Sequence, residues 1–341
     1  MTTIEGLERE LKKGELHSIY LLYGEEKFLL EASVKKIKKQ FGECVKGINF
    51  ITIDDTNNNE LISNIETPCF GYEKKLIIVK NSGLLKKDGR RKNIELEKLR
   101  NLLKDYIDKN INIINEGCII VFIEEDVDVK CDLYKILDQN GVVCKFDFQK
   151  INQIEKRIIA ICKAYNVKID NVNVKYFVES CGTNMQELIN EIRKLIEFVG
   201  PEGEISKEDI DKLSTKKLES IIFELTDNLG KKEIKKALEV FKNLIYKKEP
   251  LQKILVTLYN HFKKIYLTRI AIKNNKDIIT SLDLKSNQTF LVNKYKMQAR
   301  YFTDRDLREI LKSLIDLDYK YKIGEIDLQV GLESILCRYC S

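Results

Sequence analysis

Apolar runs and amphipathic stretches alternate through roughly the first 150 residues. Five apolar runs predict β-strands: Ile19–Tyr23, Ile48–Asp54, Lys75–Val79, Cys118–Ile123 and Val142–Phe148. Between them, two stretches repeat apolar residues at helical spacings of three and four: Leu30, Val34, Ile37 and Phe41, then Leu96, Leu99, Leu103 and Tyr106. Alternating helices and continuously apolar strands predict an α/β domain, with a parallel sheet covered by helices on both faces.

After Lys150 only helical patterns remain. The predicted helices of the next segment are Ile154–Tyr165, Val172–Ser180 and Met185–Phe198. Gly200 and Pro201 then break the chain, and the sequence from Ser206 to Asp209 has the pattern of a helix capping box. We therefore predict a small helical domain over residues 150–214.

The last part of the chain is predicted to be helical as well, over residues 215–341. One long apolar stripe predicts its core: Leu251, Ile254, Leu255, Leu258, Phe262 and Ile265. Another helix is predicted to begin at Thr303, and the final helix carries Leu328, Leu332 and Ile335. The predicted architecture is thus an α/β domain over residues 1–149 followed by two all-helical domains.

The composition is that of a reduced globular protein. Nine cysteines is an odd number, and several lie within apolar runs, as is typical of buried thiols in the cytoplasm. Cys337 and Cys340 form a lone CxxC pair without a second pair or a nearby histidine, so no metal site is expected. The N-terminus carries no apolar signal segment, so we expect a cytoplasmic protein.

The first predicted strand leads into a turn that resembles a phosphate-binding loop without its chemistry. A P-loop that began at Gly24 would need glycine, lysine and a hydroxyl residue where Leu29, Leu30 and Glu31 stand. Glu25 and Glu26 would also repel a polyphosphate. The acidic run Glu124–Asp126 stands where a magnesium-binding pair would fall in a P-loop enzyme, but without a phosphate cradle we interpret it as acidic residues at a strand end. We therefore expect no nucleotide, no metal and no other cofactor at this degenerate P-loop.

Catalytic chemistry is not indicated elsewhere. The two histidines, His17 and His261, are far apart and match no triad-like signature. An ATPase-like layout without catalytic residues favours a binding role. Two alternatives stay open, an active P-loop ATPase and a stand-alone nucleic-acid-binding protein.

One loop concentrates positive charge: Lys86, Lys87, Arg90, Arg91 and Lys92. Such a cluster can contact DNA phosphates, because these contacts depend on charge more than on side-chain geometry. It contains no aromatic residue on which bases could stack, so a solvated loop is the alternative interpretation. The net charge of +6 is modest for a dedicated DNA-binding protein.

Four local patterns occur in order along the chain. They are YLLYGEEKFL at residues 20–29, ETPCFGYEKKLIIV at residues 66–79, NEIRKL at residues 190–195, and Asp318 followed by Lys322–Gly324. Together with the degenerate P-loop they resemble the delta subunits of bacterial DNA polymerase III clamp loaders. The resemblance spans nearly the whole chain.

The resemblance implies a fold, a set of partners and a mode of action. The three domains would be an AAA+-like α/β domain, a helical lid and a helical collar that assembles a ring. The partners would be the sliding clamp (beta), the ATP-hydrolysing motor subunits, the delta-prime subunit and primed DNA. The chain would open the clamp as a non-catalytic subunit of the polymerase holoenzyme, with no ATPase activity of its own.

By the same resemblance, a helix tip formed by Thr67, Pro68, Cys69 and Phe70 would bind the clamp. Phe70 would be the principal contact, and Cys69 stands where the family commonly has a larger apolar residue. From their spacing of four, Leu61 and Ile65 are expected to anchor the helix to the core. The alternative is that Phe70 packs under the third strand.

Overall fold

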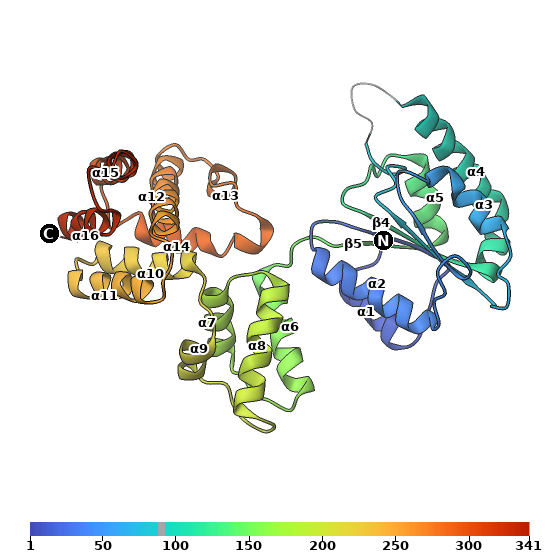
Figure 1. Ribbon diagram of the computed structural model, residues 1–341, viewed down its shortest axis with the longest axis horizontal. Coiled ribbons are helices and arrows are strands. Elements are labelled where there is room, and N and C mark those ends of the chain that lie inside the picture. The colour runs from blue at the N-terminus through green and yellow to red at the C-terminus, as the bar shows by residue number, and fades with distance from the viewer. Residues whose placement is uncertain (88–92, 341) are drawn as a thin grey trace. The chain divides into compact units, whose positions relative to one another are not determined.

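The computed structural model describes residues 1–87 and 93–340. The chain forms two compact units, Met1–Phe148 and Gln149–Ser341, and each is described by itself (Figure 1). Arg90, Arg91 and Lys92, which are predicted to contact DNA, lie outside the described residues. In the described part, no helix combines the length and the apolar character needed to cross a membrane.

A parallel sheet forms the centre of the first unit. Its strands are β1 (Ile19–Tyr23), β2 (Phe50–Ile53), β3 (Lys75–Lys80), β4 (Cys118–Glu124) and β5 (Val142–Lys145). The strand order is β2-β3-β4-β1-β5, and every neighbouring pair is parallel. All residues of β1 are buried, which agrees with the predicted sheet covered on both faces.

Two strands are shorter than the sequence predicts. At the start of β2, Ile48 and Asn49 instead lie in a turn, where their N–H groups donate to the carbonyl oxygen of Val45. At the end of β5 the chain leaves the sheet after Lys145, because the neighbouring strand β1 ends at Tyr23. The predictions of Ile48–Asp54 and Val142–Phe148 were therefore wrong at these ends.

Within the described residues of this unit, five α-helices cover the sheet: α1 (Ile4–Lys12), α2 (Lys27–Phe41), α3 (Leu61–Glu66), α4 (Ile94–Gly117) and α5 (Asp132–Asn140). A short 3-10 turn, η1 (Asn58–Glu60), precedes α3. Figure 1 shows α1 and α2 on one side of the sheet and the other three helices on the opposite side. On that opposite side, Leu61 and Ile65 of α3 pack with Ile77 in one buried cluster.

In the described part of the second unit, the regular elements are helices, and one isolated parallel β-bridge joins Lys168 and Glu204. Its helices are α6 (Ile151–Ala164), α7 (Asn171–Cys181), α8 (Met185–Val199), α9 (Lys207–Leu213), α10 (Leu218–Gly230), α11 (Ile234–Tyr246), α12 (Leu251–Lys273), α13 (Ile278–Ser281), α14 (Leu291–Gln298), α15 (Asp304–Lys322) and α16 (Leu328–Cys340), with a 3-10 turn η2 (Ser286–Gln288). The capping box predicted at Ser206 is present, and the helix predicted to begin at Thr303 also starts with a capping box.

A single buried cluster joins α10 to α16. It includes the predicted stripe residues Ile254, Leu255, Leu258, Phe262 and Ile265, together with Leu328, Leu332 and Ile335. The predicted fold class, an α/β domain followed by helical segments, is confirmed. The division of residues 150–341 into a lid and a collar stays a prediction.

Candidate functional site

The turn after β1 requires glycine because another strand passes close to it. Gly24 has φ = +131°, and a Cβ atom placed there would lie 2.4 Å from the carbonyl oxygen of Phe146. A side chain at this position would therefore collide with the backbone that continues β5. The close approach accounts for Gly24 without any phosphate.

Two backbone N–H groups of this turn already have partners. Gly24 donates to the carbonyl oxygen of Glu124 at 3.3 Å, and Glu26 donates to that of Phe146 at 2.9 Å. A phosphate nest needs such groups to point outward into open space. Leu29 and Leu30 are buried in the position of the missing glycine and lysine, whereas Glu31 is exposed. The degenerate P-loop therefore lacks both the cradle and the charges for a polyphosphate.

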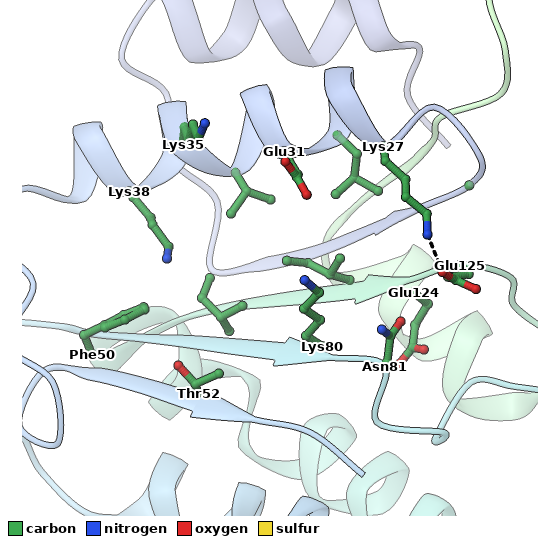
Figure 2. A pocket seen from close by; sticks show the side chains of 15 residues that line it. Lys27, Glu31, Lys35, Lys38, Phe50, Thr52, Lys80, Asn81, Glu124 and Glu125 are labelled. Atoms are coloured by element: carbon green, nitrogen blue, oxygen red, sulfur yellow. Dashed lines mark hydrogen bonds and ion pairs between the residues drawn. The ribbon is translucent and has the colours of Figure 1, made fainter. Parts of the chain in front are cut away.

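The two glutamates at the end of β4 have hydrogen-bonding partners, and Figure 2 shows that of Glu125, which is Lys27. The buried carboxylate of Glu124 accepts hydrogen bonds from Ser82 N at 3.0 Å and Ser82 Oγ at 2.8 Å, and its burial raises its pKa. The next carboxylate, Glu125, lies 2.6 Å from Lys27 Nζ. The hydrogen bond from Lys27 lowers the pKa of Glu125.

The carboxylates of Glu124 and Glu125, which would be the magnesium ligands, are bound by Ser82 and Lys27 instead. Across residues 1–87 and 93–340, no group of three or more His, Cys, Asp or Glu side chains has the arrangement of a metal site. Lys27, at the start of α2, likewise serves the ion pair with Glu125. This end of the sheet has the strand–turn–helix layout of a nucleotide site, but its polar groups bind other groups of the protein.

The segment that resembles the clamp-binding motif follows α3 rather than forming its tip. The helix ends at Glu66, and Thr67 is extended with φ = −70° and ψ = 121°. The reason is Pro68, because a proline disfavours helical conformation in the residue before it. The expectation that Thr67–Phe70 are helical was wrong, and these residues form a loop between α3 and β3.

Phe70 is the most exposed large apolar residue described, at 92% of its accessible surface. The alternative that it packs under the third strand is therefore wrong. Its neighbours Thr67 and Pro68 are exposed, and Cys69 is half-buried. A ring that is almost fully exposed contributes little apolar burial within this chain and is accessible to a partner.

Lys75 organises this loop, and the sequence analysis did not identify it. The side chain is 3% exposed, and its ammonium group donates to the carbonyl oxygens of Asn64 at 2.8 Å and Thr67 at 2.7 Å. The last carbonyl groups of a helix lack intrahelical partners, so this lysine satisfies the end of α3. The available signal was a lysine at the start of the otherwise apolar run Leu76–Val79.

The predicted sites do not come together. Gly24 follows the carboxyl end of β1, whereas Phe70 precedes the amino end of β3. Because the strands are parallel, these positions lie at opposite ends of the sheet. Lys86 and Lys87 are exposed in the segment after β3, at the same end as Gly24.

Comparison with known proteins places this architecture in a family. Residues 20–147 match the family model described as DNA polymerase III, delta subunit. Residues 219–339 match the model described as DNA polymerase III delta subunit, C-terminal domain. The two matches lie in the first and second units, respectively.

Whole-chain relatives agree with the family matches. The chain is 28% identical over 338 residues to DNA polymerase III subunit delta of Bacillus subtilis, covering 96% of this chain and 94% of the relative. It is 25% identical over 310 residues to the probable DNA polymerase III subunit delta of Aquifex aeolicus, covering 88% and 85%. The solved Bacillus subtilis DNA clamp loader delta protein superposes with a TM-score of 0.76 at 26% identity, covering 99% of each chain.

Proposed function

Because the chain belongs to the family of DNA polymerase III delta subunits and is a clamp loader component, we propose that it binds and opens the sliding clamp without hydrolysing ATP. Its direct partner is the clamp. Within the loader it assembles with the ATP-hydrolysing motor subunits and the delta-prime subunit, and the complex acts on primed DNA. The helices α10–α16 form the collar through which it joins them, and α6–α9 form the lid.

The observation that carries the proposal is the exposure of Phe70 on a loop whose base is fixed. At 92% exposure the ring is free to enter an apolar pocket on a partner. The hydrogen bonds from Lys75 hold the preceding backbone, which lowers the conformational entropy lost on binding. A buried aromatic anchor at an interface contributes about 2 kcal/mol or more.

The lack of hydrolysis is supported by the geometry at Gly24. The N–H groups that would bind phosphates have backbone partners, and the carboxylates that would hold magnesium bind Ser82 and Lys27. ATP therefore binds the neighbouring motor subunits. When the motor subunits bind ATP, the conformation of the loader changes and Phe70 becomes accessible to the clamp. The clamp ring then opens because the Phe70 loop binds the distorted subunit interface of the clamp more tightly than the interface of the closed ring.

The test is a binding measurement between this protein and the sliding clamp of the same organism. We expect Phe70→Ala to weaken binding about 30-fold, which corresponds to roughly 2 kcal/mol. The matched control is Tyr246→Ala, which removes an aromatic ring of 88% exposure from α11. An unchanged affinity for Phe70→Ala would reject the assignment of the loop.

DNA contact by Lys86 and Lys87 stays a prediction within this proposal. We expect the isolated protein to bind primed DNA weakly, because modest net charge supplies little counterion release. Tight binding that falls steeply with salt, in the absence of any partner, would instead support the stand-alone nucleic-acid-binding alternative. The family matches do not favour that alternative.

A further inference from the structure

The sheet face beneath α2 carries an open groove that the proposed clamp contact does not use (Figure 2). It has a volume of about 510 Å³ and lies between α2 and strands β2, β3 and β4. Its apolar floor is made by Leu30, Val34, Phe50, Ile78 and Ile123. The groove exists because α1 and α2 leave the β2 edge of this face uncovered, where Thr52 and Lys80 are exposed.

Lysine side chains line part of this floor, and the carboxylates of Glu31, Glu124 and Glu125 line another part. Lys35 and Lys38 come from α2 and Lys80 comes from β3, and Figure 2 shows Lys38 and Lys80 directed into the space between helix and sheet. Within the described residues, no carboxylate lies within 4.0 Å of their ammonium groups. Lys38 instead lies 4.4 Å from the centre of the Phe50 ring.

We propose that this groove binds an acidic amphipathic segment of a partner protein. Apolar side chains of the segment pack on Val34 and Ile78, and its carboxylates pair with Lys35, Lys38 and Lys80. Burial of the apolar side chains supplies affinity, and the lysines supply orientation and specificity. The groove volume is within the range of about 300–1,000 Å³ that is typical of ligand sites.

Other occupants fit the groove less well. A nucleoside polyphosphate would need outward N–H groups, and those of Gly24 and Glu26 are occupied. Single-stranded nucleic acid would need an aromatic face for stacking, and Lys38 lies over the ring of Phe50. The carboxylates of Glu31, Glu124 and Glu125 also line the groove. A phosphate chain carries a charge on every nucleotide and cannot avoid them, whereas a peptide can place its carboxylates beside the lysines alone. A second copy of this chain carries the same net charge of +6 and is disfavoured for that reason.

The groove is independent of the clamp contact. Phe70 follows α3, which covers the opposite face of the sheet, and it precedes the amino end of β3. Charge reversal at Lys35 and Lys80 is therefore expected to leave clamp affinity unchanged. The experiments can therefore reject clamp binding through Phe70 or peptide binding in the groove independently of each other.

The experiment is a selection of random peptides displayed on phage. The full-length protein is the target, and the Lys35→Glu/Lys80→Glu double variant is used for counter-selection. Both lysines are exposed, so the double variant is expected to fold normally. We expect the surviving peptides to combine apolar residues with several Asp or Glu residues.

A selected peptide is then measured by fluorescence anisotropy. We expect about tenfold weaker binding or more to the double variant, because two pairs each change from attractive to repulsive. Replacing the acidic residues of the peptide by their amides should have a similar effect. The control is Lys39→Glu, an exposed lysine of α2 that does not line the groove, and it should change binding little.

Several outcomes would overturn the proposal. They are the absence of surviving peptides, enrichment of peptides without acidic residues, and an equal loss of binding in Lys39→Glu. Binding of a labelled single-stranded oligonucleotide with the same dependence on Lys35 and Lys80 would assign the groove to nucleic acid instead. Self-association of the wild-type protein that the double variant abolishes would assign it to a second copy.

Discussion

The ammonium group of Lys75 lies 2.7 Å from the carbonyl oxygen of Thr67, so the first residue of β3 holds the loop that carries Phe70. The same group lies 2.8 Å from the carbonyl oxygen of Asn64 in α3. A buried cation is unfavourable unless it is hydrogen-bonded, and here the exposed end of a helix supplies the acceptors. The sheet thus fixes the base of the loop and leaves its end accessible.

We expect Lys75→Met to weaken clamp binding while Phe70 itself is unchanged. Methionine keeps the approximate length of the side chain but leaves the carbonyl groups of Asn64 and Thr67 without their donor. The free energy of unfolding should fall by about 1–3 kcal/mol, as expected for buried polar groups that lose their partner. Hydrogen exchange of residues 63–74 should increase, which reports directly on the loop.

Two further variants separate positioning from general destabilisation. Lys75→Arg keeps N–H donors and should recover part of the clamp affinity. Lys74→Met changes the neighbouring exposed lysine, whose Nζ donates to Asn115 O at 2.8 Å, and should leave the loop unchanged. If Lys75→Met lowers stability without affecting loop exchange or clamp affinity, Lys75 has no positioning role.

The sequence predicted what depends on local pattern. Continuous apolar runs located all five strands, and the spacing of Leu61 and Ile65 correctly predicted that α3 is anchored to the core. It did not predict Lys75 as a partner of Thr67, because the contact joins two different elements. In addition, a lysine in a sequence pattern is normally expected to be exposed, whereas Lys75 is buried. The end of the helix at Glu66 was not predicted although Pro68 indicates it, because the family resemblance implies a helix tip that continues through Thr67–Phe70.

The Gly24–Phe146 contact leads to a prediction about stability. We expect Gly24→Ala to lower the free energy of unfolding by roughly 1–3 kcal/mol, because it combines an unfavourable φ with a steric clash. Gly14→Ala is the control, since Gly14 has φ = +82° but no atom near its Cβ position. Equal losses in urea unfolding experiments would show that the contact with Phe146 has no separate effect.

The N–H groups of Gly24 and Glu26, after β1, donate to backbone carbonyl oxygens, and this leads to a prediction about nucleotide binding. We expect magnesium and ATP to leave the melting temperature of the isolated protein unchanged. A nucleotide present at a hundred times its Kd would stabilise the native state by roughly 2.7 kcal/mol, which thermal unfolding detects readily. A motor subunit of the same clamp loader serves as the positive control. A clear upward shift, or turnover of ATP, would contradict the proposal.

His261 gives the second unit a predicted dependence on pH. The imidazole is 4% exposed in the core of α10–α16, and burial lowers its pKa from 6.5 to about 4. Its Nε2 lies 2.7 Å from Gln298 Oε1. Because the amide nitrogen of Gln298 donates to Phe223 O and Asp227 Oδ1, the imidazole must donate to Oε1. Because its pKa is lowered to about 4, His261 is neutral in the native state near pH 7, with its proton on Nε2.

We expect the free energy of unfolding to decrease as the pH falls from about 6.5 towards 4. In this range the unfolded chain binds a proton at His261 that the native protein does not bind, so acid favours unfolding. The contribution of His261 should fall by roughly 2 kcal/mol between pH 7 and pH 5. Urea unfolding at a series of pH values measures it, and His261→Gln should flatten this part of the profile. A profile of equal slope for wild type and His261→Gln would show that the buried imidazole is not the group responsible.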